Sequence, residues 1–375
     1  MATKIQESDA HLDDYVSSLG GISRRDFMKF CAGITATMGL PASVSWQIAE
    51  AATNPQRPPV IWLSAQECTG CTESLLRTSH PSIEHLILDL ISLDYHETLN
   101  VGAGHQAEAA LKKSVEDNAG KFILVVEGSV PVKDGGRYCM IAGRPFGDIV
   151  KEVAAKAAAV IAIGSCASWG GWQSSDPNPT GATGIPEFLS GTTVVSIPGC
   201  PPNGYNFMST VAYFLTLKKL PELDALGRPK FAYGRLIHEN CERRPHFDAG
   251  RFAEQFGDEG HRLGYCLYKL GCKGPMTRNN CSALHYCDVG AWPVNTGRPC
   301  FGCSEEGIGF TIPLFTEADI ENVTPSSVHP PIQTTRGGGI SKGAAALLGG
   351  IGGAAIGAGA VAAKRLGDKD KGDNS

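Results

Sequence analysis

The thirteen cysteines of this 375-residue chain are the residues whose type and spacing could do chemistry. They are too sparse for a small domain built on disulfides, and the chain is long enough to bury the cores of about two domains without such cross-links. Thiolates also bind zinc and iron–sulfur clusters. The cysteines therefore predict metal or cluster sites, and their positions indicate how many.

Four of the cysteines come directly after predicted strands. From Pro58 onward, short apolar runs alternate with helical segments, which predicts a parallel, doubly wound sheet. The runs are residues 60–63, 86–93, 122–126, 160–163 and 194–197. Three of them lead into turns that contain Cys68, Cys71, Cys166 and Cys200, which we call the first group. Because parallel strands end at one edge of a sheet, we expect these thiols to meet there.

The spacing of the first group favours a cubane iron–sulfur cluster over zinc. Structural zinc sites are typically built from two tight C-x2-C pairs. Here one such pair meets two isolated cysteines from separate loops. The surrounding glycines and prolines keep bulky side chains away and free backbone N–H groups to bond sulfide.

A second group of candidate ligands lies beyond residue 233, where the strand pattern fades. His238 stands three residues before Cys241, so both side chains share one face if that turn is helical. With Cys266 and Cys272 downstream, the four predict another cluster site. A neutral imidazole in place of a thiolate raises the reduction potential of a cluster, as in Rieske centres. Such a site suits the entry or exit of electrons.

The third group consists of Cys281, Cys300 and Cys303, and the spacing leaves Cys287 open as an additional ligand. Three thiolates suffice for a [3Fe–4S] cluster, because it lacks the iron that a fourth ligand would hold. Aromatic residues and prolines stand between these cysteines. Of the cysteines left over, Cys31 lies in a predicted export signal, and Cys139 and Cys287 are expected to pack as small apolar side chains rather than to bind metal.

The amino-terminal end predicts export. Ser23-Arg24-Arg25 precedes an uncharged stretch that ends near Ala49-Glu50-Ala51, a pattern that resembles a cleaved twin-arginine signal. That route carries folded proteins, so a cofactor assembled in the cytosol can cross with its chain. The alternative is a solvated arginine pair before a short helix.

The carboxyl-terminal end predicts a membrane anchor. Residues 343–363 carry no charge and, at about 1.5 Å per helical residue, reach roughly 30 Å, the thickness of a bilayer core. Their glycine- and alanine-rich composition leaves a flexible linker open as the alternative. Glycines four residues apart favour close packing against a partner helix. The basic tail that follows is expected on the cytoplasmic side, which puts the body of the protein outside.

The chain is therefore expected to divide into six segments. They are the signal, residues 1–51; a flavodoxin-like α/β domain, 56–230; a loop-rich cluster domain, 231–315; a linker, 316–342; the transmembrane helix, 343–363; and the cytoplasmic tail, 364–375.

Taken together, the motifs resemble the small subunit of [NiFe] hydrogenases, and most closely the membrane-bound hydrogenase-2 type. The shared motifs are SRRDFMK, ECTGCTES, GSCASWGG, PGCPPN and RLIHENCERRPHFD, followed by the later cysteine block and the apolar tail. The resemblance covers nearly the whole chain.

The resemblance implies a role for each group. The first group would hold a proximal [4Fe–4S] cluster, nearest the Ni–Fe site of a separate large subunit. The second would hold a distal [4Fe–4S] cluster near the outer surface. The third would hold a medial [3Fe–4S] cluster, with Pro293 near the place of the absent fourth ligand. This chain would then have no catalytic residue of its own.

The resemblance also implies the partners and the location. Electrons from H2 would pass through the clusters to the quinone pool by way of a membrane acceptor, either cytochrome b-like or ferredoxin-like with an integral membrane subunit. The complex would lie on the periplasmic side of the inner membrane. Oxygen-tolerant relatives carry two further cysteines near the proximal cluster, where this chain has Gly70 and Gly171, so ordinary oxygen sensitivity is expected.

Three other classes of protein are disfavoured. The net charge of −5 and the scattered basic residues argue against a nucleic-acid partner. The single-cluster subunit of respiratory NADH dehydrogenase resembles the first domain but would lack the second cysteine block and the signal. A secreted structural protein with six disulfides would not be expected to place its cysteines at strand ends.

Overall fold

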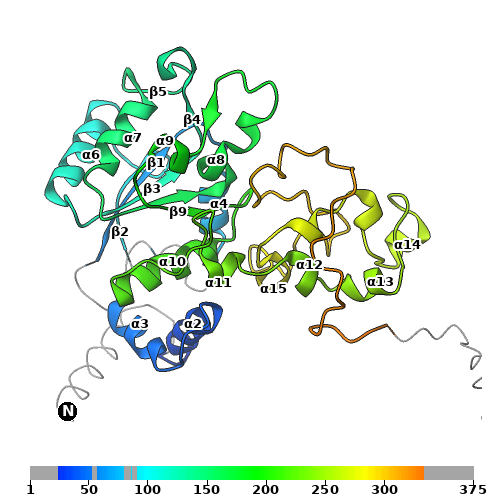
Figure 1. Ribbon diagram of the computed structural model, residues 1–375. Coiled ribbons are helices and arrows are strands. Elements are labelled where there is room, and N and C mark those ends of the chain that lie inside the picture. The colour runs from blue at the N-terminus through cyan, green and yellow to red at the C-terminus, as the bar shows by residue number, and fades with distance from the viewer. Residues whose placement is uncertain (1–23, 53–56, 80–85, 87–90, 333–375) are drawn as a thin grey trace, which may run out of the picture. The chain divides into compact units, whose positions relative to one another are not determined.

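The computed structural model describes residues 24–52, 57–79, 86 and 91–332. Five parallel strands form the central sheet in the order β2-β1-β3-β7-β9 (Figure 1). Their bounds are Pro59–Ser64 for β1, Ser92–His96 for β2, Ile123–Glu127 for β3, Ala159–Ile163 for β7 and Val194–Ile197 for β9. Numbered along the chain, this order is 2-1-3-4-5, which is that of doubly wound sheets of the flavodoxin type. The predicted parallel α/β sheet is confirmed.

Four of the five strands form where continuous apolar runs predicted them. The fifth, β2, begins at Ser92, whereas the predicted run covered residues 86–93. This prediction was wrong because β2 is an edge strand that pairs only with β1, and most of its residues are only half-buried. An edge strand needs no continuous apolar run, and the nearby Leu86 and Ile91 are buried without belonging to it.

Helices cover both faces of the sheet. They are α4 (Gly70–Leu76), α6 (His105–Asp117), α7 (Phe146–Ala154) and α10 (Gly204–Leu217). Ile61 of β1 belongs to the core that α6 and α7 complete, and the adjacent Trp62 belongs to the opposite core with α4 and α10. Because alternate side chains of a strand point to opposite faces, burial on both sides explains the apolar runs.

Short elements surround the carboxyl edge of the sheet. They are β4 (Val130–Pro131), η2 (Lys133–Gly136), β5 (Met140–Ile141), β6 (Arg144–Pro145), α8 (Gly164–Trp169), η3 (Gly171–Ser174), β8 (Ala182–Thr183) and α9 (Ile185–Phe188). Of these, α8 follows β7 without an intervening loop.

The chain beyond Tyr233 is built from loops and short helices, within the same compact unit that ends at Pro330. After α11 (Lys230–Tyr233), the helices are α12 (Ile237–Asn240), α13 (Arg244–Asp248), α14 (Glu259–Arg262), η4 (Tyr268–Leu270), η5 (Gly274–Met276) and α15 (Cys281–Leu284). Its own buried cluster contains four cysteines among ten residues, so thiols form a large part of this core. The predicted loop-rich region is confirmed.

Two further helices precede the sheet, α2 (Arg24–Thr37) and α3 (Val44–Ala52). They pack on each other, and α3 packs on α10. Cys31 is fully buried between them. The helices of the described part of the chain are all too short or too polar to cross a bilayer. The predicted transmembrane helix, residues 343–363, and the tail, 364–375, lie outside the described residues.

Candidate metal centres

The structure brings the first group together at the carboxyl edge of the sheet. Its members follow three different strands, β1, β7 and β9; they are Cys68, Cys71, Cys166 and Cys200. The pKa of the Cys71 thiol is raised well above its usual value, first by burial and then by the negative charges of Glu127 and the other three thiols. Cys68 and Cys200 are exposed, so this group opens to the surface of the chain.

Gly164 allows the close approach of two of these loops. It has a φ of +87°, and a Cβ atom at this position would lie 2.5 Å from the Cys71 Sγ atom. Only glycine adopts this backbone conformation without strain and leaves that space free. The helix that carries Cys166 can therefore begin directly beside the loop that carries Cys71.

A buried carboxylate, which sequence reasoning missed, fixes the first loop. Glu127, the last residue of β3, is 1% exposed and accepts hydrogen bonds from the backbone N–H groups of Cys71 (2.9 Å) and Thr72 (3.3 Å). It also accepts bonds from the Thr72 hydroxyl (2.5 Å) and the Trp62 indole N–H (3.2 Å). The position of Glu127 at the end of a strand, at the same edge as the cysteines, was the available signal.

His96 completes this network from the edge strand. Its ring stacks on Trp62 at 5.1 Å between centroids, and its Nε2 atom lies 3.1 Å from the Thr72 hydroxyl. Burial lowers the pKa of His96 to about 4, so the ring is neutral at pH 7. The first turn of α4, which contains Cys71, is thus held by hydrogen bonds from two strands.

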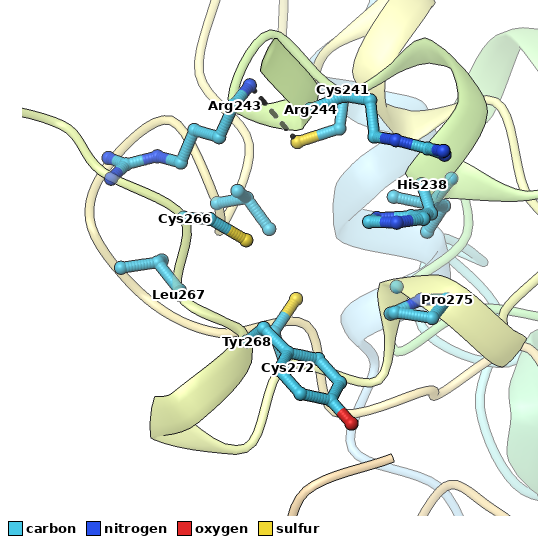
Figure 2. Close-up of a pocket in the computed structure, with 12 residues that line it drawn as sticks. His238, Cys241, Arg243, Arg244, Cys266, Leu267, Tyr268, Cys272 and Pro275 are labelled. Carbon is cyan, nitrogen blue, oxygen red and sulfur yellow. Dashed lines mark hydrogen bonds between the residues drawn. The ribbon is translucent and has the colours of Figure 1, made fainter. Parts of the chain in front are cut away.

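The second group surrounds a buried cavity in the loop-rich part (Figure 2). Figure 2 shows the sulfur atoms of Cys241, Cys266 and Cys272 and the ring of His238 directed toward the same space. All four side chains are at least nine-tenths buried. The space between the lining residues amounts to about 330 Å³, its opening included.

The imidazole ring of His238 is in a state that can bind a metal. Its buried Nε2 atom has no hydrogen-bond partner within the described part of the chain. Burial, and then the positive charge of Arg244, lower the pKa of His238 to about 4, which keeps the ring in the neutral form that binds metals. Phe247 packs against the ring at 4.5 Å. A buried imidazole nitrogen that is neutral and unpaired can accept a metal.

Two arginines lie beside the second group. The backbone N–H of Arg243 donates to the Cys241 Sγ atom at 3.4 Å (Figure 2). Arg244 is fully buried and its Nε atom pairs with Asp248 at 2.8 Å. Both positive charges oppose the effect of burial on Cys266, whose thiol pKa is still raised to about 12.

The structure also brings together Cys281, Cys300 and Cys303. Burial raises the pKa of each thiol, and Cys281 and Cys303 are each affected by another member of the group. The Tyr286 hydroxyl lies 3.3 Å from the Cys281 Sγ atom. Cys287 is half-buried. The mutual electrostatic influence of Cys281, Cys300 and Cys303 supports the three-thiol set.

Hydrogen bonds link the third group to the other two. The Ser165 hydroxyl, next to Cys166, donates to the carbonyl oxygen of Cys303 and accepts from the N–H of Gly199 at 3.0 Å. On the other side, the N–H of Lys273, next to Cys272, donates to the carbonyl oxygen of Cys300 at 2.6 Å. The thiol groups thus follow one another in the order first, third, second.

The donors fit iron–sulfur clusters. In such a cluster each ligand binds a different iron, so the ligands stand apart around it. The donor set of buried thiols and one neutral imidazole is that of such clusters, and iron would displace the protons that these thiols otherwise retain.

The two remaining cysteines have no such surroundings. Cys139 packs half-buried against the core beneath α7, and burial raises its thiol pKa to about 11. Burial of Cys31 raises its thiol pKa to about 12. Neither belongs to any of the three groups.

Two family patterns match this chain, one on each side of the boundary between the sheet and the loop-rich part. The family pattern for the C-terminal part of the NiFe/NiFeSe hydrogenase small subunit matches residues 233–316. The pattern for the 20 Kd subunit of NADH ubiquinone oxidoreductase matches residues 68–214, which contain the first group.

Individual proteins match over much greater lengths. The Hydrogenase-2 small chain of Escherichia coli (strain K12) is 57% identical over 356 residues, which are 95% of this chain and 96% of that protein. The periplasmic [NiFe] hydrogenase small subunit of Solidesulfovibrio fructosivorans is 50% identical over 297 residues, 79% of this chain and 93% of that one. The solved [NiFeSe]-hydrogenase of Dm. baculatum superposes with a TM-score of 0.65 and 33% identity, covering 70% of this chain and 99% of that chain.

Proposed function

We propose that this chain, which belongs to the [NiFe] hydrogenase small-subunit family, carries electrons from the hydrogen-splitting site of a large subunit to an acceptor in the membrane. Membership makes it a subunit of an H2-oxidising oxidoreductase, with the large subunit as its partner and iron–sulfur clusters as its cofactors. The assignment of each cluster, the acceptor and the membrane attachment are our proposals.

Each thiol group is assigned one cluster. The proximal [4Fe–4S] cluster is held by Cys68, Cys71, Cys166 and Cys200; the medial [3Fe–4S] cluster by Cys281, Cys300 and Cys303; and the distal [4Fe–4S] cluster by His238, Cys241, Cys266 and Cys272. When bound, such clusters accept and donate single electrons. The observation that supports this order most directly is the pair of hydrogen bonds that join the third group to the first and to the second.

The chain's own residues would bind the clusters, shield them from water and hold the segments that carry the ligands in place. Glu127 and Ser165 fix the loops of the first group through buried hydrogen bonds. The exposed Cys68 and Cys200 leave that group at the surface, where a large subunit would cover it. A broad, permanent contact there would exclude water from the proximal site.

Location follows from the two ends of the chain. The Arg24-Arg25 pair supports export in the folded state, and residues 343–363 support an anchor in the inner membrane with the body in the periplasm. The relative from Solidesulfovibrio fructosivorans is itself named periplasmic. The acceptor is then a quinone-linked membrane protein, cytochrome b-like or ferredoxin-like with an integral membrane subunit. A chain that ends at residue 342 should be recovered in the soluble periplasmic fraction; membrane-bound truncated protein would contradict the anchor.

Iron analysis and EPR test the cluster assignment on the purified complex. The cluster formulae predict about eleven irons in this chain, to which the Ni–Fe site of the large subunit adds its own iron. A near-isotropic [3Fe–4S] signal should disappear in Cys300→Ser and persist in the matched control Cys139→Ser, whose thiol lies outside the groups. A natively assembled, active complex whose small subunit contains no acid-labile sulfide would refute the proposal.

A further inference from the structure

Lys273 is a buried cation between the second and third thiol groups. Its side chain is 0% exposed. It follows Cys272 directly in the chain, and its backbone N–H donates to the carbonyl oxygen of Cys300 at 2.6 Å. A lysine is rarely buried without a partner of opposite charge, so its position calls for an explanation.

The surroundings of the Nζ atom require the charged form. It contacts four carbonyl oxygens, those of Gly271 at 2.9 Å, Pro313 at 3.1 Å, Leu314 at 3.3 Å and Thr316 at 2.5 Å. All four are acceptors. A neutral amine would direct its lone pair at one of these oxygens, whereas an ammonium group offers donors only.

The charge of Lys273 is solvated but not neutralised. In the part of the chain that the structure describes, no ion pair to Lys273 occurs, although the neighbouring Lys269 pairs with Glu254 at 2.6 Å. Carbonyl dipoles solvate a cation but leave its net charge in place. The uncompensated positive charge therefore acts on the two thiol groups beside it.

We infer that Lys273 is a fixed positive charge that raises the reduction potentials of the medial and distal clusters. The inference rests on the proposed function, because it requires clusters at both groups. An added electron makes a cluster more negative, and a nearby buried cation stabilises that state with little screening. Lys273 thus favours the movement of electrons from the proximal cluster to the medial and distal clusters. It acts through its charge and binds no cluster itself.

The test is a redox titration of the complete membrane complex, followed by EPR. In Lys273→Met the medial and distal clusters should each have a lower potential, by at least a tenfold change in the reduced-to-oxidised ratio, or about 59 mV for a one-electron couple. The proximal cluster is the internal reference and should not move. Lys273→Arg keeps the charge and should restore both potentials toward those of the native complex.

Lys269→Met is the matched control. It removes the same charge from the same loop, but Lys269 is partly exposed and paired with a carboxylate. Its potentials should equal those of the native complex. Equal potentials in Lys273→Met and the native complex, or an equal drop in Lys269→Met, would overturn the inference, since Lys273 would then only tie the loop at residues 313–316 to Cys272.

A second variant covers the case in which Lys273→Met fails to assemble. Lys273→Gln keeps a donor for the carbonyl oxygens around Nζ but removes the charge. Both potentials should fall as in Lys273→Met, and unchanged potentials would count against the inference. Failure of the proposed function has a different result: the native complex itself would lack acid-labile sulfide and the [3Fe–4S] signal.

Discussion

Replacing Gly164 with alanine should remove iron from the first group while the sheet remains folded. The added methyl group would lie 2.5 Å from the Cys71 Sγ atom, well inside the contact distance of about 3.5–4.0 Å for carbon atoms. The φ of +87° adds backbone strain of about 1–2 kcal/mol, because it is unfavourable for a residue with a side chain.

The size of the effect follows from these two contributions. Relief of the overlap must displace Cys71 or α8, and overpacking of this kind costs about 1–3 kcal/mol. The sum of about 2–5 kcal/mol would weaken cluster binding at the first group by more than tenfold, since about 1.4 kcal/mol corresponds to a factor of ten.

Iron analysis of the purified complex measures the outcome. Iron should fall by about four per complex, the loss of one four-iron cluster, while the [3Fe–4S] EPR signal persists. Gly191→Ala is the control, because Gly191 has a φ of +94° but no atom within 4 Å of the added carbon. Full iron content in Gly164→Ala, or equal loss in Gly191→Ala, would refute the reasoning.

Three further changes test other parts of the structure. His96 binds a proton near pH 6.5 in the unfolded chain but only near pH 4 in the folded chain. The free energy of unfolding should therefore fall by up to about 3 kcal/mol as the pH drops from 6.5 to 4. Thermal unfolding of His96→Asn should show a weaker dependence on pH. Arg228→Met breaks buried ion pairs with Asp224 and Glu305, both at 2.8 Å, and should lower the free energy of unfolding by about 3–5 kcal/mol. Arg144→Met, which breaks the exposed Arg144–Glu152 pair, should lower it by less than about 1 kcal/mol. Hydrogen oxidation on an electrode should stop under air. Replacing Gly70 and Gly171 with cysteine should not restore the current, because the added Cβ atoms would lie 3.1 Å from the Cys68 Sγ atom and 2.7 Å from the Cys166 Cα atom. A sustained current under air would contradict this prediction.

The sheet could be predicted because its strands are buried on both faces. Val60 to Leu63 and Ile123 to Val126 are almost fully buried, so each strand is an uninterrupted apolar run. The predicted position of the edge strand β2 was wrong because part of its surroundings is polar. Asp94 accepts hydrogen bonds from Ser114 and Asn118, at the end of α6. Periodicity cannot locate a strand whose residues have mixed surroundings.

The meeting of the first four cysteines could also be predicted, since strand direction alone brings them to one edge. The partners of the buried charges could not. Lys273 bonds to carbonyl oxygens some forty residues further along the chain, and backbone oxygens leave no mark on a sequence. Nothing in the sequence pairs Glu127 with its four donors, which lie 55 to 65 residues earlier in the chain.

The region beyond Tyr233 differs physically from the sheet, and this bears on how the protein assembles. Its helices are three to five residues long, too short to be stable alone, and four of the ten residues in its buried cluster are cysteines. Buried thiols without metal contribute little more than small apolar groups, whereas metal bound to them contributes directly to folding. We therefore expect iron removal to expose this region to proteases before the sheet, and equal protection of both would contradict this. Such dependence of the second half on its clusters would agree with the proposed export in the folded state.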